Sequence, residues 1–130
     1  MIAIWDNRLS VGDAGIDAEH RLVLNLLNEL DVVFAVAAPR VVVEKALEAL
    51  VRAVSRHFAR DASADGPVRT HMAYQARVER LLRDWHSGEL PVIDRSTLLS
   101  LGRGWIDHIG RREAYGQALP PDASANRLAV

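Results

Sequence analysis

The histidines are the residues of this sequence whose types and spacing suggest chemistry. His57 and Asp61 stand four residues apart at the end of a long apolar-periodic segment, and on a helix that spacing places both side chains on one face. Three further histidines, His20, His71 and His108, fall in other segments with helical periodicity. Imidazole nitrogens and carboxylate oxygens are common ligands of transition metals. A fold that brings these five side chains together would build a metal site.

Length and composition restrict the classes of protein to which the chain can belong. Its 130 residues are enough for one domain with a hydrophobic core. The formal net charge is -1, so nothing global attracts the chain to nucleic acid or to an anionic membrane. The absence of cysteine excludes disulfides, thiolate metal sites and cysteine nucleophiles. No apolar run approaches the roughly 20 residues of a membrane span, and the N-terminus lacks a signal pattern. We therefore expect a soluble cytoplasmic protein.

Apolar residues at helical spacing predict two helices in the first half of the chain. Residues 1–16 form an irregular arm, and Asp17 is the residue that we expect to cap the first helix. The periodic pattern continues for about 20 residues and ends before Pro39. Pro39 suits the first turn of a second helix, whose apolar face extends to about Ala64.

A third helix is predicted after a tight break at residues 65–67, which read Asp-Gly-Pro. Its face carries five residues at helical spacing: His71, Gln75, Val78, Leu82 and Trp85. The pattern ends near Gly88, which is typical of the residue that follows a helix.

The fourth helix is the least regular of the four. Asp94 can cap it, and it runs to about Ala118. Three glycines, each costing a helix about 1 kcal/mol relative to alanine, stand inside it: Gly102, Gly104 and Gly110. Four helices with short connections predict an all-α fold, an up-down-up-down antiparallel four-helix bundle over residues 1–118. Residues 119–130 are predicted to form a disordered tail.

The register of such a bundle brings the histidines to one level. His20 lies about 18 residues before the first turn and His57 lies 18 after Pro39, so both stand about 27 Å from that turn. By the same count, Asp61 and His71 flank the 65–67 break, and Gln75 and His108 lie equally far from the third connection. Each helix therefore offers a histidine to one layer of the bundle.

A simpler interpretation is that each histidine is a core residue with a hydrogen bond, as a lone histidine on an apolar face usually is. Four imidazoles in one layer would, however, cost several polar desolvations. His86 provides the contrast, because it lies at the opposite end of the third helix and is expected at the surface.

The order of these motifs resembles the hemerythrin family in its bacterial single-domain form, over about residues 5–116. The family has W…VG…IDxxH, then HFxxE, then HxxxH, then W…HIxxxD. The matching positions are Trp5, Val11-Gly12, Ile16-Asp17 with His20, His57-Phe58, His71 with position 75, and Trp105 with His108-Ile109. Each motif alone is weak, whereas their order and spacing are specific.

The resemblance implies a non-heme diiron centre, with two iron ions bridged by an oxo or hydroxo group and by two carboxylates. The metal positions that it implies are His20, His57, Asp61, His71, Gln75, His108 and Glu113. Three of them depart from the family pattern: Asp61 replaces a glutamate, Glu113 replaces an aspartate, and Gln75 replaces a histidine. The implied ligand of the centre is dioxygen.

Three functions are compatible with this pattern. The first is dioxygen binding, for carriage, delivery or sensing, and it is the one we favour over catalysis. The second is an oxidase or peroxidase-like enzyme, since glutamine is a poor iron ligand and leaves an open position on the second iron. The third is a divergent bundle with little or no metal that acts as an interaction module.

Overall fold

The structure is a computed structural model that describes residues 1–61, 69–90 and 92–116, and the side chains of residues 61 and 111–116 lie outside that description. A short 3-10 helix, η1 (Asn7–Leu9), precedes four α-helices: α1 (Ala14–Ala35), α2 (Arg40–Asp61), α3 (Arg69–Ser87) and α4 (Arg95–Gly116). No strand occurs among the described residues. The all-α fold with four helices is therefore confirmed.

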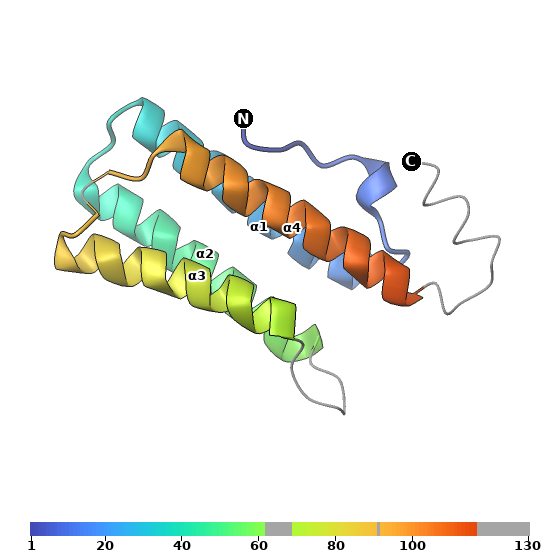
Figure 1. Cartoon of the computed structure of the whole chain (residues 1–130). Coiled ribbons are helices and arrows are strands. Elements are labelled where there is room, and N and C mark those ends of the chain that lie inside the picture. The colour runs from blue at the N-terminus through green and yellow to red at the C-terminus, as the bar shows by residue number, and fades with distance from the viewer. Residues whose placement is uncertain (62–68, 91, 117–130) are drawn as a thin grey trace.

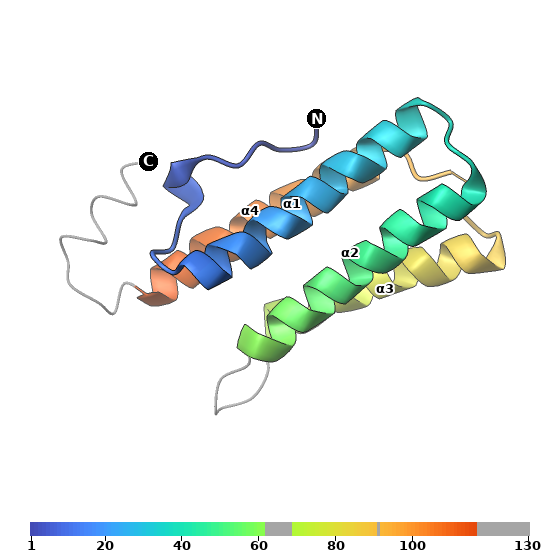
Figure 2. The ribbon, with the colours of Figure 1, turned by 180° about the vertical axis from the view of Figure 1, so that it is seen from behind.

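The helices form two layers, in which α4 lies beside α1 and α3 lies beside α2 (Figures 1 and 2). The connection from α1 to α2 and the one from α3 to α4 lie at one end of the molecule, while α2 ends and α3 begins at the other (Figure 1). The apolar faces of all four helices meet in a single core. No helix in the described part of the chain combines the length and apolar character needed to cross a membrane.

The start of α1 differs from the sequence prediction. Asp13, not Asp17, caps the helix, since its carboxylate accepts from Ile16 N. Asp17 lies in the first turn, where its side chain accepts from Ser10 Oγ at 2.5 Å and from Val11 N at 2.9 Å. Both aspartates are suitable caps. The Asp17 carboxylate is bonded to the N-terminal arm, so it is not available to cap the helix. Asp17 therefore fastens the arm to α1.

The beginnings of α2 and α4 agree with the predictions. The carbonyl of Pro39 accepts from Val42 N and Val43 N, which starts α2 directly after the proline. At α4, Asp94 Oδ1 accepts from Thr97 N at 2.8 Å. This bond to the Thr97 backbone is the main reason why the pKa of Asp94 lies below its usual value. The predicted end of α2 at Ala64, the 65–67 break, the end of α4 at Ala118 and the tail at 119–130 all lie outside the described residues.

The buried face of α3 is rotated from the one that the sequence predicted. It consists of His71, Tyr74, Val78 and Trp85, whereas Gln75 and Leu82 are half-buried. Tyr74 donates from its hydroxyl to Leu101 O in α4 at 2.7 Å.

The glycines of α4 leave room for the N-terminal arm and for the Tyr74 side chain of α3. A Cβ on Gly104 would lie 3.0 Å from the Tyr74 ring, and one on Gly102 would lie 2.6 Å from the Ile2 side chain. Both distances are shorter than ordinary carbon contacts. The two glycines lower the helix propensity of α4. In return, they allow the N-terminal arm and Tyr74 to pack closely against this helix.

Candidate metal centre

Three imidazoles from three helices converge in the core. His20 of α1, His57 of α2 and His108 of α4 are all buried. His57 Nε2 lies 3.2 Å from His20 Nε2 and 3.0 Å from His108 Nε2. One nitrogen from each ring falls within 4.8 Å of the other two, which makes the three residues a candidate set of metal ligands.

The separations of these nitrogens suit ligands of a single ion. Two nitrogens that bind one metal ion at about 2.1 Å, with an angle of about 95° between them, lie about 3.1 Å apart. A core histidine held by hydrogen bonds needs only one partner at each ring nitrogen. His57 Nε2 has two imidazole nitrogens at hydrogen-bond distance, which is more than that simpler interpretation requires. The cluster can therefore hold a metal ion.

A carboxylate supports His57 from behind. His57 Nδ1 lies 2.8 Å from Glu19 Oε1, and Arg60 forms an ion pair with the other oxygen of Glu19. A proton on Nδ1 that is donated to Glu19 leaves the lone pair of Nε2 directed into the cluster. Histidines that bind metals almost always have such a partner on the second nitrogen. The sequence analysis missed Glu19, although its position directly before His20 put a carboxylate next to a predicted ligand.

His71 completes the histidine layer, where its ring lies against Phe58 and His108. Its ring stacks on Phe58, with centroids 4.5 Å apart and planes within 7° of parallel. The centroid of His71 lies 4.7 Å from that of His108. Trp105 closes the layer on the core side: its indole Nε1 donates to His20 O at 3.0 Å, and its ring lies 4.8 Å from the His108 ring. The register prediction of one histidine from each helix in one layer is therefore confirmed.

The remaining predicted site residues have different outcomes. Gln75 donates from Nε2 to Glu79 Oε1 at 2.9 Å, so its amide is bonded one turn further along α3. Helices α2 and α4 include Asp61 and Glu113, but the side chains of both lie outside the described residues. His86 is 48% exposed, as predicted for the histidine outside the layer.

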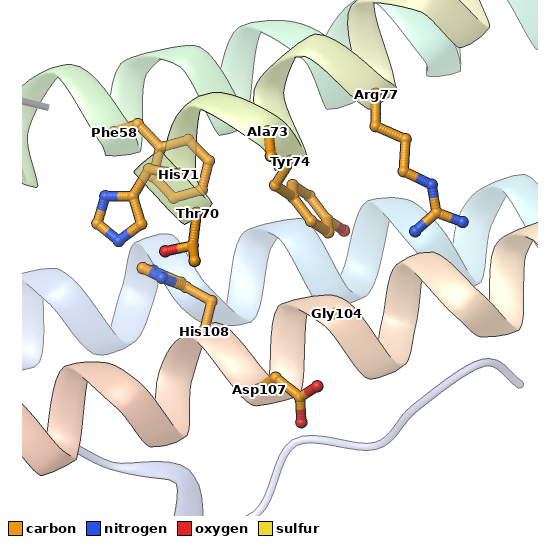
Figure 3. A pocket seen from close by; sticks show the side chains of 9 residues that line it. All are labelled: Phe58, Thr70, His71, Ala73, Tyr74, Arg77, Gly104, Asp107 and His108. Atoms are coloured by element: carbon orange, nitrogen blue, oxygen red, sulfur yellow. The ribbon is translucent and has the colours of Figure 1, made fainter. Parts of the chain in front are cut away.

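A pocket of about 280 Å³ between α3 and α4 reaches two of the four imidazoles. His71 and Phe58 border it on one side and His108 on the other, while Arg77 and Asp107 lie further from the histidines (Figure 3). Tyr74 also lines the pocket, and burial raises the pKa of its hydroxyl well above the usual range. The tyrosine therefore stays neutral, and the pocket gives small molecules a route to His71 and His108.

Comparison of the chain with protein-family models, with curated proteins and with solved structures found no match. The function is therefore inferred from the side chains and their arrangement. The starting point is a buried histidine cluster that could hold a metal ion, and the described residues around it form four α-helices and no strand.

Proposed function

We propose that this chain is a hemerythrin-like protein, an up-down-up-down antiparallel bundle that holds non-heme iron in its histidine layer and binds dioxygen. The observation that carries the proposal is the convergence of His20, His57 and His108, with Glu19 behind His57. The positions of the helix connections in Figure 1 support the bundle topology. Dioxygen carriage, delivery and sensing all require the same binding step.

The ligand types favour iron. Imidazoles with carboxylates and no thiolate suit iron among the common transition metals, and the chain contains no cysteine. The resemblance to the hemerythrins, and not the geometry, assigns Asp61 and Glu113 as the two carboxylates that would hold the metal pair, since they stand four residues after His57 and five after His108, as in the family motifs. When bound, a pair of ferrous ions supplies the electrons that reversible dioxygen binding needs.

The protein's own side chains have three tasks in this proposal. Glu19 orients His57 and keeps its Nε2 deprotonated toward the iron. Trp105 and Phe58 surround the imidazoles with apolar rings and exclude water from the core side. The pocket at His71 and His108 admits a molecule of the size of dioxygen.

One observation favours a second function, that of an oxidase or peroxidase-like enzyme. The amide nitrogen of Gln75 is bonded to Glu79, and the remaining amide oxygen is a weaker iron ligand than the imidazole that the family has at this position, so the second iron would be held weakly there. The pocket leads to the same side of the layer, at His71 and His108. A metal position that is both open and reachable favours oxygen activation over reversible binding.

Metal analysis of protein expressed in iron-rich medium tests the proposal. We expect two iron ions per chain, an absorption band that changes reversibly with dioxygen, and loss of both in His57→Ala. Glu29→Gln, on the exposed side of α1, is the control and retains them. Because iron binds only the folded chain, its removal lowers the thermal midpoint, with about 2.7 kcal/mol lost at a free concentration 100 times the Kd.

The other outcomes of this experiment have definite meanings. A single ion per chain contradicts the bridged centre and retains the three-histidine site. Turnover with peroxide in place of reversible dioxygen binding supports the enzyme. A chain that carries no metal, and melts at the same temperature with or without iron, is an interaction module, and the proposal fails.

A further inference from the structure

A second group of metal-ligating side chains lies at the other end of the molecule from the predicted layer. Glu44 and Glu48 belong to the first half of α2, and His86 belongs to the last turn of α3. His86 Nε2 lies 3.8 Å from Glu44 Oε1 and 3.9 Å from Glu48 Oε1. One ligand atom from each of the three falls within 4.8 Å of the other two.

This group is separate from the histidine layer. Along α2, Glu48 precedes His57 by nine residues, which is about 14 Å of helix rise. Along α3, His86 follows His71 by 15 residues, or about 22 Å. The start of α2 and the end of α3 lie together at the end of the molecule that also holds the α1–α2 connection (Figure 1).

The local structure holds the three side chains toward one another. Glu44 and Glu48 are four residues apart, so they share one face of α2. Arg40, one turn before Glu44, donates to Trp85 O, and its guanidinium lies 4.3 Å from the centroid of the Trp85 ring. This link fastens the start of α2 to the residue that precedes His86. The packing of α2 on α3 therefore places the His86 imidazole next to the carboxylates of Glu44 and Glu48.

The distances between these atoms suit a bridging ion better than a direct bond. At 3.8 and 3.9 Å, the contacts of His86 Nε2 with the two carboxylates are too long for hydrogen bonds. Two donors that each bind a tetrahedral ion at about 2.1 Å lie about 3.4 Å apart. The two contacts of His86 exceed that separation by about 0.5 Å or less. All three side chains are partly exposed, so the small rotations that close the geometry are not opposed by packing.

We propose that Glu44, Glu48 and His86 form a surface site for a divalent transition-metal ion that joins α2 to α3. One imidazole with two carboxylates suits Zn²⁺, which binds histidine nitrogen and carboxylate oxygen, or Cu²⁺, which has the highest affinity of the divalent first-row ions for such ligands. The competing cations are weakly placed: Arg40 Nε lies 4.0 Å from Glu44 Oε1, and Arg52 Nη1 lies 3.9 Å from Glu48 Oε2. Exposed pairs at such distances stabilise little. The ion therefore displaces no strong interaction.

The site has a direct consequence for counting metals. Two metal ions per chain can arise from one buried ion and one surface ion as well as from a bridged pair. His86→Ala separates the two cases, because it removes a ligand of the surface site and leaves the histidine layer unchanged. The inference does not depend on the proposed function, and it holds if the buried cluster carries no iron.

Zinc titration against a chromophoric chelator tests the site. We expect the native chain to bind one Zn²⁺ more than His86→Ala, and Glu44→Gln to bind that ion at least about tenfold more weakly. Glu29→Gln removes an exposed carboxylate from α1 and serves as the matched control, with binding equal to that of the native chain. The imidazole resonances of His86 should shift as this additional Zn²⁺ ion binds.

Each remaining outcome decides the question. His86 is largely exposed, so circular dichroism of His86→Ala without metal should equal that of the native chain, and any difference in zinc binding then belongs to the site. If His86→Ala binds the same number of zinc ions with the same affinity, and the His86 resonances do not move, the group is a surface ion pair and the inference is wrong. Loss of iron in His57→Ala with retention of this zinc keeps the two sites distinct.

Discussion

Replacing Glu19 by glutamine separates the metal-supporting role of this residue from its structural role. Glutamine has the same shape, and its side-chain oxygen can still accept from His57 Nδ1, which now lies 2.8 Å from Glu19 Oε1. What the change removes is the negative charge. That charge makes the His57 imidazole a stronger donor to a metal ion and also pairs with Arg60.

The expected magnitudes of the two effects differ. Loss of a carboxylate behind a metal-binding histidine lowers metal affinity about 10- to 100-fold, which is about 1.4 to 2.7 kcal/mol. The ion pair with Arg60 contributes less, because the Arg60 side chain is 63% exposed and exposed pairs are worth about 0 to 1 kcal/mol. Glu19→Gln should therefore weaken iron binding far more than it lowers the free energy of unfolding without iron.

The assay measures iron affinity by competition with a chelator, and unfolding in the presence of excess chelator, for the native chain and for Glu19→Gln. Glu29→Gln, on the exposed side of the same helix, is the control and should match the native chain in both. Equal iron affinity in Glu19→Gln would show that the carboxylate does not act on a metal-bound His57. A variant that loses stability without iron by as much as it loses affinity would assign Glu19 a structural role instead.

Two further predictions concern α3 and α4. Gln75→Ala should change iron affinity by no more than about threefold, measured with the same chelator, because the amide nitrogen of Gln75 is bonded to Glu79 and an amide oxygen is a weak iron ligand; a loss as large as that of a ligand histidine would assign position 75 to the metal. Gly110→Ala should raise the thermal midpoint by about 4 °C, since a Cβ there meets no atom of the described residues within 4 Å and alanine favours the helix by about 1 kcal/mol. Gly104→Ala, whose Cβ would press on Tyr74, should give no such gain, and equal stabilisation of both variants would contradict the close contact of the Tyr74 ring with Gly104.

The helices and the histidine layer were predictable because both follow from period and length. Counting residues from Pro39 placed His20 and His57 at one height, and the structure brings their Nε2 atoms to 3.2 Å. The helix start was not predictable in the same way. Asp13 and Asp17 have equal capping chemistry, and the choice between them depends on the contact of Asp17 with Ser10, a tertiary feature that periodicity does not contain.

The rotation of α3 has the same kind of cause and bears directly on the site. Helical periodicity allows steps of three or four residues, so positions 74 and 75 were equally eligible to follow His71 on the buried face. Contacts with α4 place Tyr74 on the buried face. Gly104 has no side chain and leaves room for the Tyr74 ring, and Leu101 O accepts a hydrogen bond from the tyrosine hydroxyl. With Tyr74 inside, Gln75 is left at the boundary. Gln75, where the sequence departs from the hemerythrin pattern, is thus only half-buried, and the candidate metal ligands among the described residues of the layer are His20, His57 and His108.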